Sequence, residues 1–158
     1  MRAAGWIAAP ALVLSASNQA YAAPCWTAQA INGARVHELQ VMLMTVGLRC
    51  KAAGMDIRAS YENFEVAQSK ALTEADKAIR LHFGADASKA GRSDYNVYMT
   101  RLGNLYGTGR TDVSSCKLFK SLADSLAKPS ASGDDLSARS MEVIRDPQLD
   151  APRCPARR

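Results

Sequence analysis

Apolar residues recur at steps of three and four along most of the chain, a spacing typical of helices with one buried face. The strongest stripe lies in residues 34–51 and consists of Val36, Leu39, Leu43, Val46 and Cys50. More apolar residues lie on its sides, so this helix needs neighbours in several directions. We therefore predict that it is the central helix of a bundle.

A second stripe predicts one long helix over residues 56–83, because no Gly or Pro interrupts the chain before Gly84. Thr73 followed by Asp76 resembles a capping box, so a break at that point is the alternative. Residues 85–92 are mostly small or polar and are expected to form an exposed loop.

Two further stripes predict a helix between residues 93 and 107 and another that stops before Pro129. Asp112 or Ser114 is expected to cap the second of these. A strict alternation of apolar and polar residues persists nowhere, so strands are not expected. The fold class is therefore all-α, a compact bundle of about four main helices.

The composition divides the chain into three parts. We predict a signal peptide over residues 1–22, a helical domain over 23–128 and a weakly ordered segment over 129–158. The last part is rich in Ser, Gly, Asp, Pro and Arg. One short helix is expected between Leu136 and Ile144, followed by an irregular C-terminal tail. The apolar content is judged too low for another element of the core.

The first residues show the order of a secretory signal. A positive end at residues 1–2 precedes an apolar run over 3–16 and the small-x-small motif at 20–22. The apolar run is too short to span a membrane. We expect cleavage before Ala23, periplasmic or secreted localisation, and no membrane anchor after cleavage.

Two alternatives for this region are less favourable. Lipidation of Cys25 would require Leu or a similar residue at position 22 and Gly or Ala at position 24, where Ala22 and Pro24 stand. An uncleaved amphipathic anchor is disfavoured by Pro10 and by the absence of basic residues after Arg2 within this region.

The chain holds four cysteines, and an even number in an exported protein indicates two disulfides. Three pairings are possible. We favour Cys50–Cys116, because both residues continue apolar helical stripes, with Cys25–Cys154 tying the two ends together. Zinc binding is the alternative, but no Cys-x-x-Cys pair is present.

The charge pattern and short motifs point to no cofactor and no nucleic-acid partner. The net charge is +5 at pH 7, but the basic residues are scattered and are not interleaved with stacking aromatics. The glycine-rich run over 103–111 lacks a preceding strand and a Lys-Ser or Lys-Thr pair. Termination of a helix explains its glycines more simply.

The two histidines, His37 and His82, are the most suitable residues for a catalytic base or a metal ligand. Neither has metal-ligand spacing to another ligand, and most such histidines lie on surfaces or at helix ends. No Gly-x-Ser-x-Gly motif is present. We predict no catalytic residue.

Tyrosines are the other candidate site residues. Their hydroxyls would suit the rim of a groove for a partner or ligand, although core packing is the preferred interpretation. The candidates for such a surface are Tyr61, Tyr95, Tyr98 and Tyr106.

The segments at 37–50, 61–64, 82–84 and 94–107 together resemble a group of uncharacterised, signal-peptide-bearing proteins from alphaproteobacteria. The resemblance covers residues 25–120 and leaves the tail outside. It implies export to the periplasm. It assigns no catalytic or binding residue.

The function expected from these observations is non-enzymatic. The protein would act through its surface, in an envelope or stress role, on an unidentified periplasmic protein or a small ligand. An enzyme that uses His37 or His82 with a nearby carboxylate is one rival, and it requires the two groups to meet in a cleft. An acid- or stress-responsive chaperone is another, and it predicts that the fold loosens at low pH.

Overall fold

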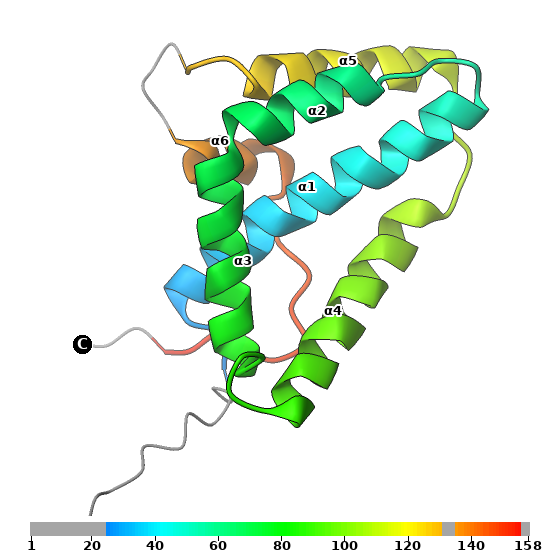
Figure 1. The fold of residues 1–158 in the computed structure, drawn as a ribbon. Helices are drawn as coiled ribbons and strands as arrows, with labels where there is room; N and C mark the ends of the chain where they lie inside the picture. The colour runs from blue at the N-terminus through cyan, green and yellow to red at the C-terminus, as the bar shows by residue number, and fades with distance from the viewer. Residues whose placement is uncertain (1–24, 131–134, 156–158) are drawn as a thin grey trace, which may run out of the picture.

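The computed structural model describes residues 25–130 and 135–155, which form an all-helical fold (Figure 1). The predicted signal peptide over 1–22 and its cleavage before Ala23 lie outside the described residues. The helices are α1 (Ala28–Ala52), α2 (Arg58–Ala67), α3 (Ser69–Phe83), α4 (Lys89–Gly107), α5 (Val113–Leu126) and α6 (Leu136–Val143). The predicted fold class is confirmed.

The first helix, α1, is the centre of the fold, as its apolar stripe predicts. It contacts each of the five other described helices, and Leu39, Leu43 and Val46 are at most 1% exposed. The helix begins earlier than residue 34, because the Thr27 hydroxyl accepts a hydrogen bond from the amide of Ala30 and caps its start.

The prediction of one helix over residues 56–83 is wrong. The chain turns a corner at Gln68, so that α2 lies beside α5 and α3 crosses the first part of α1 (Figure 1). The Gln68 side chain donates to the carbonyl oxygen of Leu126 at 2.8 Å and fixes this corner to the end of α5. The alternative break at Thr73 is also wrong, since Thr73 lies inside α3 and donates to the carbonyl oxygen of Ser69.

The expected loop over residues 85–92 is shorter than predicted, because α4 already begins at Lys89. The Ser88 hydroxyl accepts from the amide of Gly91 at 2.9 Å and caps the helix. Gly84 ends α3 in the left-handed conformation, with φ of 62°. The two helices therefore meet across a tight connection.

Both favoured disulfides are present. Cys50–Cys116 joins α1 to α5 with both cysteines fully buried. Cys25–Cys154 joins the two ends of the described chain. The predicted cap of α5 is confirmed as well, because the Asp112 carboxylate accepts from the amide of Ser115 at 2.7 Å.

The segment after Pro129 contributes more to the core than its composition predicts. The expected short helix forms as α6, and both Leu136 and Ile144 join the core at 2% and 6% exposure. The expectation that this segment adds no core element is wrong, because two well-placed apolar residues suffice to cover one side of α1. Beyond α6 the tail is irregular, as predicted, with a single parallel bridge between Trp26 and Arg153.

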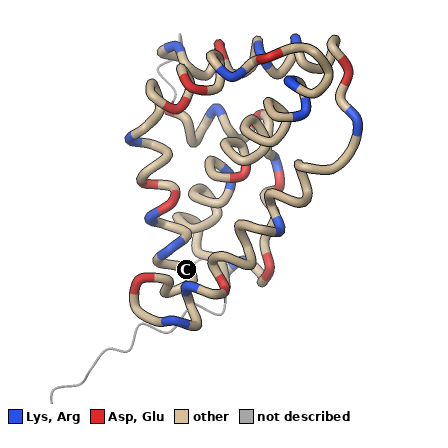
Figure 2. Tube along the Cα trace, turned by 45° about the vertical axis from the view of Figure 1, so that its right-hand side comes forward, with Lys and Arg blue, Asp and Glu red and all other residues tan. Residues whose placement is uncertain are grey.

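The buried residues of the described chain form two clusters on opposite sides of α1. One joins α1 to α2, the first half of α3, α5 and α6. The other, which we call the aromatic core, joins α1 to α3, α4 and the tail, and its largest members are Trp26, Phe83 and Tyr98. Lys and Arg are interspersed with Asp and Glu over the described chain, and neither sign gathers in one region (Figure 2).

Candidate functional site

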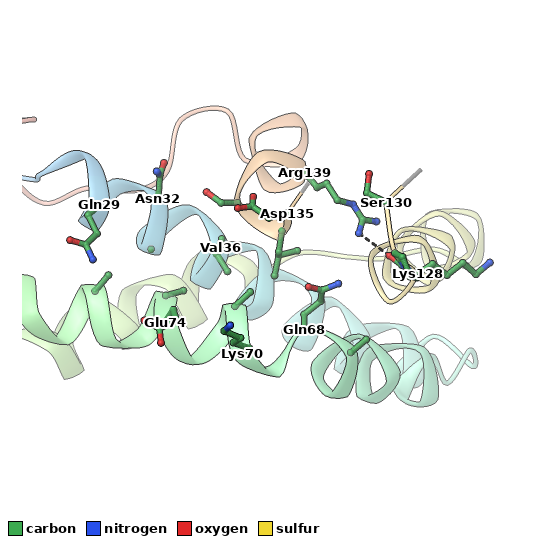
Figure 3. A pocket seen from close by; sticks show the side chains of 18 residues that line it. Gln29, Asn32, Val36, Gln68, Lys70, Glu74, Lys128, Ser130, Asp135 and Arg139 are labelled. Atoms are coloured by element: carbon green, nitrogen blue, oxygen red, sulfur yellow. Dashed lines mark hydrogen bonds between the residues drawn. The ribbon is translucent and has the colours of Figure 1, made fainter. Parts of the chain in front are cut away.

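A groove of about 610 Å³ lies where the first half of α1, the end of α2, α3, the segment that follows α5 and the start of α6 meet (Figure 3). Its floor is apolar and consists mostly of small residues. Its mouth carries amide and charged side chains. The residues labelled in Figure 3 are Gln29, Asn32, Val36, Gln68, Lys70, Glu74, Lys128, Ser130, Asp135 and Arg139.

Small residues create this groove. A Cβ added to Gly33 would lie 2.9 Å from the carbonyl oxygen of Ala75 and 3.0 Å from the Cβ of Ala78, so α1 and α3 are in direct contact there. Next to this contact, Ala67 and Ala71 line the groove with side chains too short to reach across to α6. Space therefore remains between α3 and α6 although α1 closes the floor.

The far wall of the groove is held by hydrogen bonds within the protein. The Arg139 guanidinium of α6 donates to the carbonyl oxygens of Ser125 at 2.6 Å and Lys128 at 3.0 Å, at the end of α5. The Asp135 carboxylate accepts from the amide of Ala138 at 2.9 Å and caps α6. These contacts fix α6 against α5 before any ligand binds, which is the preorganisation that a binding site needs.

The charges at the mouth are unequal. Lys70, Lys128 and Arg139 carry positive charge, and Glu74 and Asp135 carry negative charge. Among the described residues, neither Lys70 nor Lys128 forms an ion pair. The Lys70 ammonium is therefore available to an anionic group of a ligand, whereas the Lys128 side chain extends away from the groove and interacts with the charge of Asp124 (Figure 3).

The four candidate tyrosines do not line this groove. Tyr98 is fully buried and the other three are half-buried. Burial raises the pKa of all four, to about 12 for Tyr95. Each of the four hydroxyls donates a hydrogen bond to an acceptor within the protein: Tyr61 to Glu65 (2.6 Å), Tyr95 to Asp76 (2.5 Å), Tyr98 to the Gln148 carbonyl (3.0 Å) and Tyr106 to Glu38 (2.5 Å). These hydrogen bonds favour the core-packing interpretation.

Both histidines are buried, and neither lines the groove. His82 stacks on Trp26 with ring centroids 3.8 Å apart. His37 lies in α1 at 8% exposure, and neither of its ring nitrogens has a hydrogen-bond partner among the described residues. Burial lowers the pKa of each histidine, while the charge of Asp76 acts against that shift at His37 and the charge of Asp150 does so at His82. The described residues do not bring either imidazole into hydrogen-bond contact with a carboxylate.

The burial of His37 leads to a pH-dependent prediction. The unfolded imidazole takes up a proton below about pH 6.5, whereas the folded one stays neutral to lower pH, so His37 destabilises the fold as pH falls. His37→Met should raise the free energy of unfolding by about 1 kcal/mol at neutral pH, because it removes an unpaired buried polar group. The gain should be larger near pH ~5.5, as measured by urea unfolding.

His37→Gln is the matched control, since it removes the titrating group but keeps a polar side chain. It should reduce the pH dependence without the gain at neutral pH. An equal gain for His37→Met at both pH values would contradict this role of the imidazole.

Other chemistry is not supported by the described part of the chain. Within residues 25–130 and 135–155, no three His, Cys, Asp or Glu side chains are placed to hold a metal ion. None of the helices described there combines the length and the apolar character that a membrane span requires. The glycine-rich run over 103–111 covers the end of α4 and the connection to α5, as helix termination predicts.

No protein-family model, curated protein or solved structure matches this chain. The groove is therefore interpreted from its own contacts. Sequence reasoning did not find it, because its lining comes from four helices whose arrangement depends on the corner at Gln68. The alanines at positions 71, 75 and 78 are the one signal in the sequence, since they place a narrow face of small residues on α3, next to Ala67 at the end of α2.

Proposed function

We propose that this protein is an exported, non-enzymatic binding protein that holds one small amphipathic molecule in the groove of Figure 3. The groove itself is the observation that carries the proposal. Its volume of about 610 Å³ falls within the range of about 300–1,000 Å³ that is usual for small-molecule sites. An apolar floor with a few polar groups at the mouth is the usual composition of such sites.

The lining favours a ligand with an aliphatic body and an anionic end. Val36, Ala71 and Ala75 offer apolar surface but no large aromatic side chain, which suits an aliphatic chain. Lys70 at the mouth, together with Lys128 once its exposed side chain turns inward, would attract a carboxylate or phosphate group.

Three observations support export. The first residues have the pattern of a signal peptide. The two disulfides are typical of proteins in oxidising compartments. The resemblance to signal-peptide-bearing proteins points in the same direction. We propose periplasmic or secreted localisation on these grounds.

Dodecanoate is a suitable probe for the groove. We expect it to bind in isothermal titration calorimetry with a negative heat-capacity change, because binding buries apolar surface. Ala71→Trp should abolish this binding by filling the groove. Ala59→Trp is the matched control, since Ala59 lies exposed on α2 and outside the groove, and it should leave binding unchanged.

Charge is tested with a probe of the same chain length. Dodecylammonium should bind more weakly than dodecanoate, and Lys70→Gln combined with Lys128→Gln should remove the difference. Failure of the parent protein to bind either probe would reject an aliphatic ligand. Equal binding by the Ala71→Trp and Ala59→Trp variants would show that the groove is not the site.

A further inference from the structure

The end of the chain forms a cover over the aromatic core. The terminal strap, which we define as residues 145–154, has no helix and runs from the end of α6 to the start of α1 (Figure 1). Leu149 and Ala151 of the strap pack against the aromatic core. Trp26, the largest member of that core, is 0% exposed beneath it.

Hydrogen bonds hold the strap at several points. The Glu38 carboxylate accepts from the amide of Gln148 at 2.7 Å, and the indole of Trp26 donates to Asp150 at 2.9 Å. The backbone of Trp26 donates to the Pro152 carbonyl oxygen and accepts from the amide of Cys154, both at 2.8 Å. The last part of the strap is therefore attached almost entirely to Trp26 and to the neighbouring Cys25.

The two disulfides differ in how a reductant can reach them. Cys50 and Cys116 are 0% exposed inside the bundle. Cys25 and Cys154 are only partly buried. Because thiol–disulfide exchange requires direct attack on a sulfur, access makes Cys25–Cys154 the first of the two to react.

We infer that the strap is a redox-operated cover: reduction of Cys25–Cys154 releases residues 150–154 from Trp26, while the helices stay folded and Gln148 stays bound to Glu38 and Tyr98. The reductant is a dithiol. Its two thiols are oxidised to a disulfide, and the two electrons and two protons that they give up break the S–S bond and form the thiols of Cys25 and Cys154.

Opening of the strap would change the surface of the protein. Trp26 stacks on His82 and contacts the rings of Phe83 and Tyr98, with ring centroids 5.7 Å and 5.5 Å away respectively. Once residues 150–154 leave, the side of Trp26 that they cover faces solvent. A clustered aromatic surface of this kind binds apolar segments of other molecules.

Trp26 is a built-in reporter of this opening. The sequence contains two tryptophans, and Trp6 lies in the predicted signal peptide, so Trp26 is the only tryptophan of a chain that begins at Ala23. We would treat that chain with increasing dithiothreitol, alkylate the free thiols, and identify the modified cysteines by peptide mass spectrometry. Trp26 emission, acrylamide quenching and far-UV circular dichroism would be recorded at each step.

We expect Cys25 and Cys154 to be alkylated first, with a shift of Trp26 emission to longer wavelength, stronger quenching and unchanged helical signal. Cys25→Ser combined with Cys154→Ser should give the same emission without reductant. Simultaneous reduction of both disulfides with loss of helix would overturn the inference. So would a protected Trp26 in protein whose Cys25–Cys154 bond alone is reduced.

Discussion

Gly91→Ala should destabilise the protein by about 3 kcal/mol, at the upper end of what overpacking usually causes. A Cβ at this position would lie 2.2 Å from the carbonyl oxygen of Phe83 and 2.5 Å from that of Gly84. Both obstacles are backbone atoms, so no side chain can rotate away. The start of α4 would have to move off the end of α3. Urea unfolding followed by circular dichroism measures the loss.

Gly103→Ala is the matched control in the same helix. An added Cβ there meets nothing within 4 Å, so alanine should stabilise α4 by up to about 1 kcal/mol through its higher helix propensity. Opposite signs for the two substitutions would show that close packing at Gly91 outweighs propensity. A stabilising Gly91→Ala would mean that α3 and α4 do not approach as closely as described.

Local chemistry made several features predictable from the sequence. The cap of α5 is predictable as Asp112 or Ser114, because a short polar side chain directly before an apolar helical stripe satisfies backbone amides, and Asp112 takes this role. Cys50 and Cys116 could be paired because each continued a stripe, which required both to face the interior. In these cases one short stretch of sequence held all the necessary information.

Features that depend on distant contacts were not predictable in this way. Gln68 is compatible with a continuous helix, so nothing local predicts a turn there. The contact that accompanies the turn is distant, because the Gln68 side chain binds the carbonyl oxygen of Leu126 at the end of α5. The groove follows from that corner, because only a separate α3 can meet α6 across Ala71. The contact between the strap and Trp26 was not predictable for the same reason, since the hydrogen-bonded residues Trp26 and Asp150 lie 124 positions apart in the sequence.

Removal of the Cys50–Cys116 disulfide should have the largest effect of all. Cys50→Ala combined with Cys116→Ala releases a loop with a sequence separation of 66, which corresponds to about 4 kcal/mol in the chain-entropy model. The lost sulfur atoms also leave space in a fully buried site, which adds to the loss. Urea unfolding of the double variant against the parent protein measures the total.

The Cys25→Ser and Cys154→Ser double variant provides the decisive comparison. The two cysteines that it replaces are separated by 129 positions in the sequence, so the chain-entropy model alone assigns this variant the larger loss of stability, about 5 kcal/mol. If the strap detaches when this bond is absent, however, the folded state also gains conformational entropy. This gain offsets part of the entropy that the unfolded chain gains, so the loss of stability is smaller. The helices around Cys50 and Cys116 cannot gain freedom in this way without unfolding. We therefore expect the buried pair, despite its shorter loop, to contribute more stability than the terminal pair. The reverse order would indicate that the strap stays attached without its disulfide.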